Sequence, residues 1–339
     1  MTDKVKKLAP AIWAEIQKAK RVLLHCHPSP DPDSLGGVLA MKFLLENLGK
    51  RATVIAGDSL LTTSMAKIPG FDQIVKKNYF EINLADFDLF IILDSSALGQ
   101  ISKKGRIVFP ESLATVKIDH HRNEDDFAKV NLVDTSYPAT CQIIYDLIKT
   151  WGQKITPQMA AGLFIGIYTD TGGFKYPPTS DKTLLAAADL AKIYPDYHKI
   201  IFDYENSVNP KELEFLSLAL GTIDHYFNNS VAISAVPFAE LSKRQIAPEN
   251  VHEVSLANYL VSVPGWIIGI RFTETTPNVV NLSFRRREGE GPDLSKVAIA
   301  LGGGGHSAAA GATINKPFAE AKELLLKTLQ KVYPELGKP

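Results

Sequence analysis

The sequence has 339 residues, a length at which two domains are the usual arrangement. Lys and Arg together number 37, as do Asp and Glu, so the formal net charge is zero. A chain without net charge has no overall field to hold a long polyanion such as duplex DNA, so an anionic substrate would have to be bound locally. The 2 cysteines exclude a disulfide framework and predict a reducing compartment.

The sequence does not predict a membrane protein. The first 20 residues alternate charged and apolar side chains and lack the continuous apolar stretch of a secretory signal peptide. No run approaches the roughly 18 consecutive apolar residues of a membrane span. We therefore expect a soluble, cytoplasmic protein.

The first half of the chain predicts alternating helices and strands. Residues 88–93 are apolar on both faces, as in a strand of a parallel sheet covered by helices. The expected elements, from apolar spacing, are a helix over 4–20, a strand over 21–26, a helix over 35–48, strands over 52–56, 88–93 and 114–118, and helices over 138–150, 157–167 and 181–193.

The second half predicts a smaller domain of mixed helix and strand. The pattern loosens between residues 194 and 210, which is where we place the domain boundary, and a connecting helix is expected over 211–227. Strands are expected over 231–236, 266–272 and 279–284. The predicted division is a first domain over 1–190, a linker over 191–228 and a second domain over 229–339.

Three of the predicted strands end in acidic residues or histidines. The proline-rich loop from His27 to Asp33 follows the first strand, Asp94 follows another, and Asp119-His120-His121 follows a third. Because the carboxyl ends of parallel strands lie along one edge of a sheet, these side chains can converge. Asp170, at the end of a predicted helix, is a fourth candidate.

Each cluster also has an interpretation without a ligand. Asp31, Asp33 and Ser34 could cap the next helix, and Asp94 and Asp170 could belong to ordinary turns. The run Asp119-His120-His121 is harder to explain in this way, because adjacent ionisable groups after a buried strand need solvent, a partner or a metal. Together these carboxylates and imidazoles suit a pair of divalent ions, which would act on a phosphoryl group.

The second domain offers a basic run and a glycine run. The glycines at 302–305 let backbone N–H groups approach an anion, and His306 follows them. Arg285 opens a run of three arginines, and arginine is the preferred fork for a terminal phosphate. A flexible turn and a solvated basic face are the alternative interpretations.

Taken in order, these motifs resemble those of the DHH phosphoesterase superfamily. The matching motifs are His27-x-x-Pro30-Asp31-x-Asp33-Ser34-x-Gly36, Asp94-Ser95-Ser96, Asp119-His120-His121 and Tyr168-x-Asp170-Thr171-Gly172. The run Gly303-Gly304-Gly305-His306-x-x-Ala309-x-Gly311 is similar to the superfamily's DHH-associated domain. The chain length resembles the compact oligoribonuclease/pAp-phosphatase (nanoRNase) branch, which includes enzymes that cleave linear or cyclic dinucleotides.

The resemblance implies an α/β fold, with a parallel sheet covered by helices on both faces in the DHH domain, a helical linker and a smaller α/β substrate domain. It also implies two divalent ions, with Mn²⁺ expected and Mg²⁺ or Co²⁺ as alternatives. The implied ligands are His27 and Asp31 for one ion, Asp33, His120 and Asp170 for the other, and Asp94 for both. The implied catalytic residues are His121 beside the scissile phosphate, Asp119 orienting the histidines, and Asp94. The implied contacts to the far end of the substrate are Arg285, Gly303, Gly304, Gly305 and His306.

Two positions depart from the family pattern, because Gly37 and Arg286 stand where serine is usual. The implied function is a manganese-dependent hydrolase that converts short oligonucleotides or linear dinucleotides to 5′-mononucleotides, with pAp and cyclic dinucleotides as further substrates. The same resemblance implies a homodimer. A pyrophosphatase or polyphosphatase built on the same first domain, and a nucleotide sensor without catalysis, are the alternatives.

Overall fold

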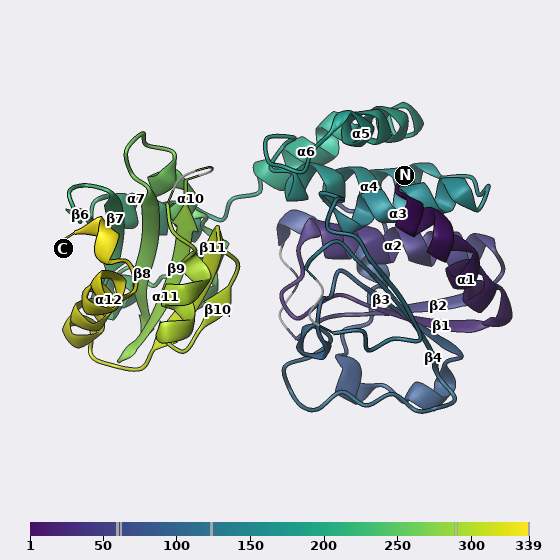
Figure 1. Ribbon diagram of the computed structural model, residues 1–339, viewed down its shortest axis with the longest axis horizontal. Helices are drawn as coiled ribbons and strands as arrows, with labels where there is room; N and C mark the ends of the chain where they lie inside the picture. Colours follow the sequence, from purple (N-terminus) through teal and green to yellow (C-terminus); the bar gives the residue numbers. More distant parts are fainter. Residues whose placement is uncertain (59–60, 62, 123–124, 288, 290, 338–339) are drawn as a thin grey trace. The chain divides into compact units, whose positions relative to one another are not determined.

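The computed structural model describes residues 1–58, 61, 63–122, 125–287, 289 and 291–337. The chain divides into two compact units, Met1–Ser207 and Val208–Pro339, and each unit has its own sheet and hydrophobic core (Figure 1). The division falls inside the segment 191–228 that the sequence indicated as a linker. The predicted α/β fold is confirmed, with a parallel sheet in the first unit and a separate mixed sheet in the second.

The first unit is built on a five-stranded parallel sheet in the order β2-β1-β3-β4-β5. The strands are β1 (Arg21–His25), β2 (Arg51–Ile55), β3 (Leu89–Leu93), β4 (Ala114–Asp119) and β5 (Val130–Val133). After β2 the chain returns to the other side of β1, so β1 and β3 are neighbours. The loops that follow these two strands therefore diverge and leave a crevice at the carboxyl edge of the sheet, where ligands bind in open α/β folds.

Helices cover both faces of this sheet, but they differ in kind. On one face, Val22, Leu24 and Ile91 belong to the core that contains α1–α4. On the other face, Leu23 and Phe90 pack against the segment between residues 79 and 113, whose helices are short 3-10 turns. The α-helices of this unit are α1 (Asp3–Lys18), α2 (Pro32–Asn47), α3 (Thr140–Thr150), α4 (Pro157–Asp170), α5 (Asp181–Ile193) and α6 (Tyr197–Glu205).

The second unit contains a six-stranded sheet in the order β10-β11-β9-β8-β7-β6. Its strands are β6 (Ile223–Tyr226), β7 (Val231–Val236), β8 (Ile268–Thr276), β9 (Val279–Arg286), β10 (Gly304–Gly305) and β11 (Ala309–Ile314). Only β7 and β8 pair in parallel among these strands. Its helices are α7 (Pro210–Leu220), α8 (Phe238–Lys243), α9 (Pro248–Glu253), α10 (Leu256–Val261), α11 (Leu294–Ala300) and α12 (Phe318–Val332).

One helix predicted near the boundary is too long, and one helix there was not predicted. The helix expected over 211–227 is too long, since α7 ends before Gly221 and residues 223–226 form β6, which pairs with β7. The loose pattern between 194 and 210 contains α6, whose Ile200 is buried in the core of the first unit. Proline and asparagine obscured this short helix, because they flank it at Pro195 and Asn206.

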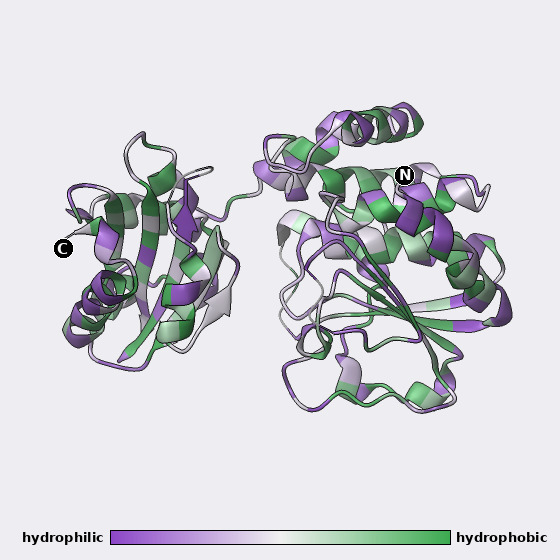
Figure 2. Cartoon of the chain, viewed as in Figure 1, coloured by the Kyte–Doolittle hydropathy of each residue, from purple (hydrophilic) through white to green (hydrophobic). Residues whose placement is uncertain are grey.

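Hydropathy follows the burial of the elements. Strand β7 is mostly hydrophobic and buried, whereas α12 exposes many hydrophilic residues (Figure 2). Among the helices of the described residues, none combines the length and apolar composition needed to cross a membrane.

Candidate active site

The loop after β1 delivers two side chains to the crevice. Asp31 is the N-cap of α2, because its Oδ1 accepts a hydrogen bond of 2.9 Å from the backbone N–H of Ser34, and Pro32 begins the helix. Ser34, which the sequence suggested as the cap, is the third residue of the helix, and its hydroxyl accepts a hydrogen bond from the His27 backbone N–H. Asp31 caps through one oxygen, and its Oδ2 lies 3.4 Å from Nε2 of His27.

Asp33 joins α2 to the start of α3. Its two carboxylate oxygens accept hydrogen bonds from the backbone N–H groups of Thr140 and Cys141, at 2.7 and 2.9 Å. These are the first two residues of α3, whose N-cap, Ala139, has no side chain that could cap it. Asp33 therefore satisfies helix donors that would otherwise be orphaned, and the helix terminus favours its negative charge.

Asp94 occupies the centre of the crevice, directly after β3. Its φ of 54° lies in the left-handed region, which an aspartate enters more readily than most residues. Oδ2 of Asp94 lies 3.5 Å from Nε2 of His27, and Oδ1 lies 3.6 Å from Nε2 of His120. The Thr140 hydroxyl donates a hydrogen bond of 3.0 Å to Oδ1. The backbone and this hydroxyl together direct the two oxygens of one carboxylate at two different histidines.

The two histidines after β4 have different partners. Nδ1 of His120 lies 3.3 Å from the carbonyl oxygen of Tyr137, while its Nε2 faces Oδ2 of Asp170 at 3.0 Å. Nδ1 of His121 lies 2.9 Å from Oδ1 of the buried Asp119 and 3.4 Å from Oδ1 of Asp94. A buried partner on one ring nitrogen fixes which nitrogen faces the site. Asp119 thus bonds His121, whereas the Tyr137 carbonyl orients His120.

The structure brings all six predicted metal ligands into one cluster. Their ligand atoms form three overlapping groups within 4.8 Å, namely His27–Asp31–Asp94, Asp33–His120–Asp170 and Asp94–His120–His121. Nitrogen and oxygen donors without a thiolate suit hard to borderline divalent ions. Nε2 of His120 is buried and makes no hydrogen bond although Asp170 lies nearby, as expected when both side chains point at a common ion. The donor set fits two divalent ions.

The buried carboxylates of the cluster repel one another. Burial, and then the charge of Asp94, raises the pKa of Asp33 to about 7. Burial, and then the charge of Asp31, raises the pKa of Asp94 to about 6. Burial lowers the pKa of His120, but Asp170 and Asp94 outweigh it and raise that pKa to about 10. The raised pKa values show that the cluster has an excess of negative charge. Divalent cations bound to these residues would neutralise that charge.

Glycines allow the two helices that carry Asp33 and Asp170 to approach closely. A Cβ on Gly36 of α2 would lie 2.1 Å from the carbonyl oxygen of Gly162 in α4. A Cβ on Gly166 would lie 2.9 Å from Oδ1 of Asp33. Backbone packs on backbone at this crossing, so the start of α2 meets the end of α4.

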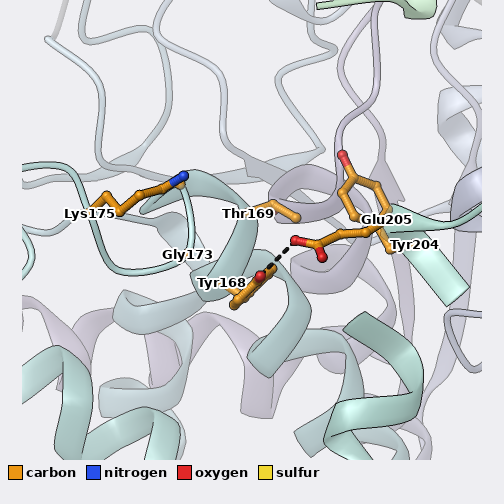
Figure 3. Close-up of a pocket in the computed structure, with 7 residues that line it drawn as sticks. Tyr168, Thr169, Gly173, Lys175, Tyr204 and Glu205 are labelled. Atoms are coloured by element: carbon orange, nitrogen blue, oxygen red, sulfur yellow. Dashed lines mark hydrogen bonds between the residues drawn. The ribbon is translucent and has the colours of Figure 1, made fainter. Parts of the chain in front are cut away.

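Two cavities adjoin these elements. One of about 540 Å³ is lined by the cluster residues His27, Asp31, Asp94 and His121, by Pro28 and Ser29, and by Ala97, Gly99, Gln100 and Lys103. The other, of about 430 Å³, lies between the end of α4 and α6 and is lined by Tyr168, Thr169, Gly172, Gly173, Lys175, Tyr204 and Glu205. Figure 3 shows the Tyr168 hydroxyl pointing at the Glu205 carboxylate, to which it donates a hydrogen bond of 2.6 Å.

The predicted substrate residues of the second unit lie on neighbouring strands. Arg285 in β9 pairs with Ala309 in β11, and the other edge of β11 pairs with Gly304 and Gly305. The sheet brings Arg285 and the glycine run to the same three strands, and the His306 backbone N–H donates a hydrogen bond to the Ala309 carbonyl across the β10–β11 turn.

Sequence reasoning missed two residues beside the predicted ones. Thr140 bonds Asp94, and its only sequence signal was its place at the start of a helix. Arg271 in β8 lies opposite Ser283, is buried, and donates a hydrogen bond to the Val251 carbonyl. Burial, and then the charge of Arg285, lowers the pKa of Arg271 to about 10. Nothing in the sequence indicated that Arg271 would be buried and repelled by a second arginine, Arg285.

The two sequence domains match known family models. Residues 21–167 match the DHH family N-terminal domain, and residues 250–335 match the DHHA1 domain. The fold and the cluster define a phosphoesterase-type α/β protein with an acidic and histidine-rich crevice. The chain contains a DHH family N-terminal domain followed by a DHHA1 domain, as the sequence motifs predicted.

Two curated relatives match over most of their length. A bifunctional oligoribonuclease and PAP phosphatase NrnA from Mycoplasma genitalium is 29% identical over 310 residues, which cover 91% of this chain and 92% of the relative. The protein of the same name from Bacillus subtilis is 28% identical over 321 residues, covering 91% and 95%. The crystal structure of an exopolyphosphatase-related protein from Bacteroides fragilis shares the fold, with a TM-score of 0.89, 21% identity and 98% of each chain covered.

Proposed function

We propose that this protein is a two-metal phosphoesterase that hydrolyses short oligoribonucleotides or linear dinucleotides to 5′-mononucleotides and converts pAp to AMP. The observation that carries the proposal is Asp94, whose two oxygens face the two histidines His27 and His120. The names of the relatives support the substrate class, because those proteins match this chain over more than nine-tenths of its length. Cyclic dinucleotides are further candidate substrates.

The cluster residues would hold the metals. His27 and Asp31 would bind one divalent ion, Asp33, His120 and Asp170 would bind a second, and Asp94 would be shared. Such ions, when bound, stabilise negative charge on the phosphoryl oxygens and activate water near neutral pH. We expect Mn²⁺, with Mg²⁺ or Co²⁺ as alternatives.

His121 is the proposed proton donor to the leaving oxygen. Its Nδ1 is engaged by Asp119, so Nε2 is the ring atom that can hand over a proton. The His121 side chain is 37% exposed and lines the larger cavity, whereas Asp119 is fully buried. Asp119 would hold the tautomer and orientation of the ring, as a buried carboxylate does for other catalytic histidines.

Arg285 and the glycine run with His306 are proposed to bind the far end of the substrate. Arginine and backbone N–H groups are suited to a phosphate. We also expect a homodimer, which light scattering on the purified protein would test.

The function is tested by a product assay with Mn²⁺ on pApA, pAp, cyclic di-AMP, a 5-mer RNA and pyrophosphate, with Asp94→Asn as the matched variant. We expect the wild-type protein to convert pApA and the 5-mer to AMP-type mononucleotides, and the variant to lose about 10²-fold or more in kcat. Turnover of pyrophosphate alone would assign the protein to the pyrophosphatase alternative. Bound metal without any turnover would favour the sensor.

A further inference from the structure

The larger cavity beside the cluster carries one cation. Among its described lining residues, Lys103 is the only lysine or arginine, and the other ionisable groups are the aspartates and histidines of the cluster. Lys103 is exposed, and it forms no ion pair with an acid among the described residues. A positive charge at the wall of an otherwise acidic cavity attracts an anion that reaches beyond the metal ligands.

The position of Lys103 is fixed by its backbone. Asp58, just after β2, accepts hydrogen bonds from the Lys103 backbone N–H at 2.6 Å and from the Ser102 hydroxyl at 2.8 Å. Ser102 and Ile101 are buried, which anchors the segment that follows β3 to the sheet. Asp58 therefore holds the main chain of Lys103, a residue that lines the cavity.

In the proposed reaction the scissile phosphate lies at the metal ions that the cluster would hold. Asp94 belongs to that cluster and also lines this cavity. A cavity of about 540 Å³ has room for more than one phosphate group. Its rim also offers the neutral amide of Gln100, which can accept from or donate to a sugar hydroxyl. The chemistry that fits is a second phosphate on the same substrate.

We propose that this cavity is a subsite for a second phosphate of the substrate and that Lys103 is the residue that binds it. The inference rests on the proposed function, since it assumes that the first phosphate is held at the cluster. Two phosphates meet the description: the 5′-terminal phosphate of a dinucleotide, and the next phosphodiester on the 3′ side of the scissile bond.

The test compares Lys103→Ala with Lys104→Ala. Lys104 is the adjacent residue and is also exposed, so both variants lose the same surface charge. Lys104 does not line the cavity, so it is the matched control. KM and kcat are measured on ApA, pApA and ApApA, and on bis(p-nitrophenyl) phosphate, which has a single phosphate. A charge-assisted phosphate contact predicts a rise in KM of about tenfold or more for Lys103→Ala.

The expected result is a higher KM on only those substrates that carry the second phosphate, with kcat unchanged and with bis(p-nitrophenyl) phosphate turned over as by the wild type. A larger rise in KM on pApA than on ApA identifies the 5′-terminal phosphate as the bound group. A larger rise in KM on ApApA than on ApA identifies the downstream phosphodiester. Lys103→Arg should retain most of the affinity.

Equal losses in both variants, or on all substrates, would overturn the subsite, because they would reflect the general charge of the surface. If the wild type turns over no substrate, the proposed function fails. The affinities of pAp and AMP for the metal-loaded protein, measured by calorimetry, then decide the subsite alone. The proposed subsite requires that Lys103→Ala weaken the binding of pAp more than the binding of AMP.

Discussion

At the scale of single residues, several side chains have two tasks each. Asp31 caps α2 and faces His27, and Asp33 caps α3 and belongs to the cluster. The capping role of these carboxylates is observed, and the same side chains belong to the cluster that is proposed to hold metal ions. Asp31 divides its two oxygens between the helix and His27, whereas both oxygens of Asp33 accept hydrogen bonds from the start of α3.

The two tasks of Asp33 can be separated by comparison with Asp170, which lies at the end of α4 and caps no helix start. We expect the free energy of unfolding of metal-free Asp33→Ala to lie about 1–2 kcal/mol below that of Asp170→Ala, because both variants lose a repelling charge but only Asp33→Ala removes the acceptor for the first turn of α3. Asp170→Ala should leave the free energy of unfolding unchanged or raised relative to the wild type, because it removes a repelling charge. Urea unfolding in EDTA measures both, and equal values for the two variants would contradict the capping role.

Thr140 is expected to act through Asp94. Thr140→Val removes the 3.0 Å hydrogen bond to Asp94 while preserving shape. We expect a decrease of about 10–100-fold in metal affinity or kcat, which is typical of a lost partner behind a metal ligand. Thr140→Ser should restore most of it, and an inactive serine variant would argue against the hydroxyl as the cause.

Asp88 predicts a pH dependence of stability away from the site. The Arg21 guanidinium, and then the backbone N–H groups of Lys20 and Arg21, lower the pKa of Asp88 to about 2. The ionised carboxylate therefore stabilises the folded chain above the unfolded pKa of about 4, and this contribution is lost as the pH falls through about 2. Asp88 is 35% exposed, so we expect about 1 kcal/mol.

The measurement is the difference in urea-unfolding free energy between wild type and Asp88→Asn at pH 6, 4 and 3. The difference should be present at pH 6 and shrink as the pH falls. A difference that grows toward low pH would have the wrong sign.

At the scale of elements, the crossing of α2 and α4 sets the distance between Asp33 and Asp170. Gly36→Ala would place a Cβ 2.1 Å from the Gly162 carbonyl oxygen, so the helices must separate. We expect a loss of about 1–3 kcal/mol in unfolding free energy, typical of overpacking, together with weaker metal binding. Gly221→Ala, whose nearest neighbour would lie at 3.4 Å, is the control and should be tolerated.

The sequence predicted many elements of the first unit well, but it missed the amphipathic helix α12 and a strand of small residues in the second unit. The helices at 157 and 181 begin at the expected residues, because proline or a cap precedes an apolar run. Strand β11 was missed, since its alanines and glycine show no alternation. Gly303 and Gly305 also have a packing role that the sequence hid, because a Cβ on either would clash with β11.

Gly37 illustrates a departure from the family that the structure explains. A Cβ there would lie 3.0 Å from Cδ1 of Ile144, so the position is packed against an apolar side chain. A serine at this position would add a hydroxyl, and its Cβ would press on Ile144 of α3. Packing between distant segments decides this, and a single sequence does not contain it.

At the scale of the whole molecule, the sequence predicted that the strand ends converge but not the strand order that makes them do so. The return of β3 to the side of β1 creates the crevice, and it depends on long-range pairing. The contacts of Asp33 with α3 and of His120 with the Tyr137 carbonyl were beyond sequence reasoning for the same reason.

The two separate cores predict that the first unit folds alone. A fragment of residues 1–207 should unfold cooperatively and bind Mn²⁺, while losing affinity for oligonucleotides. A fragment of residues 1–190, which follows the predicted first domain, would end within α5 and lack the buried Ile200 of α6, so it should melt at a lower temperature. Calorimetry on both fragments tests this, and a more stable shorter fragment would support the predicted bounds.

The borrowed cap of α3 has a consequence for the order in which the protein assembles. An 11-residue helix is marginally stable in isolation. The N-cap residue of α3 is Ala139, whose side chain cannot cap the helix. Its first turn is completed only after α2, made earlier on the ribosome, has docked and presented Asp33. The packing of α2 on α3 therefore completes a helix cap and positions a residue of the cluster through the same contact.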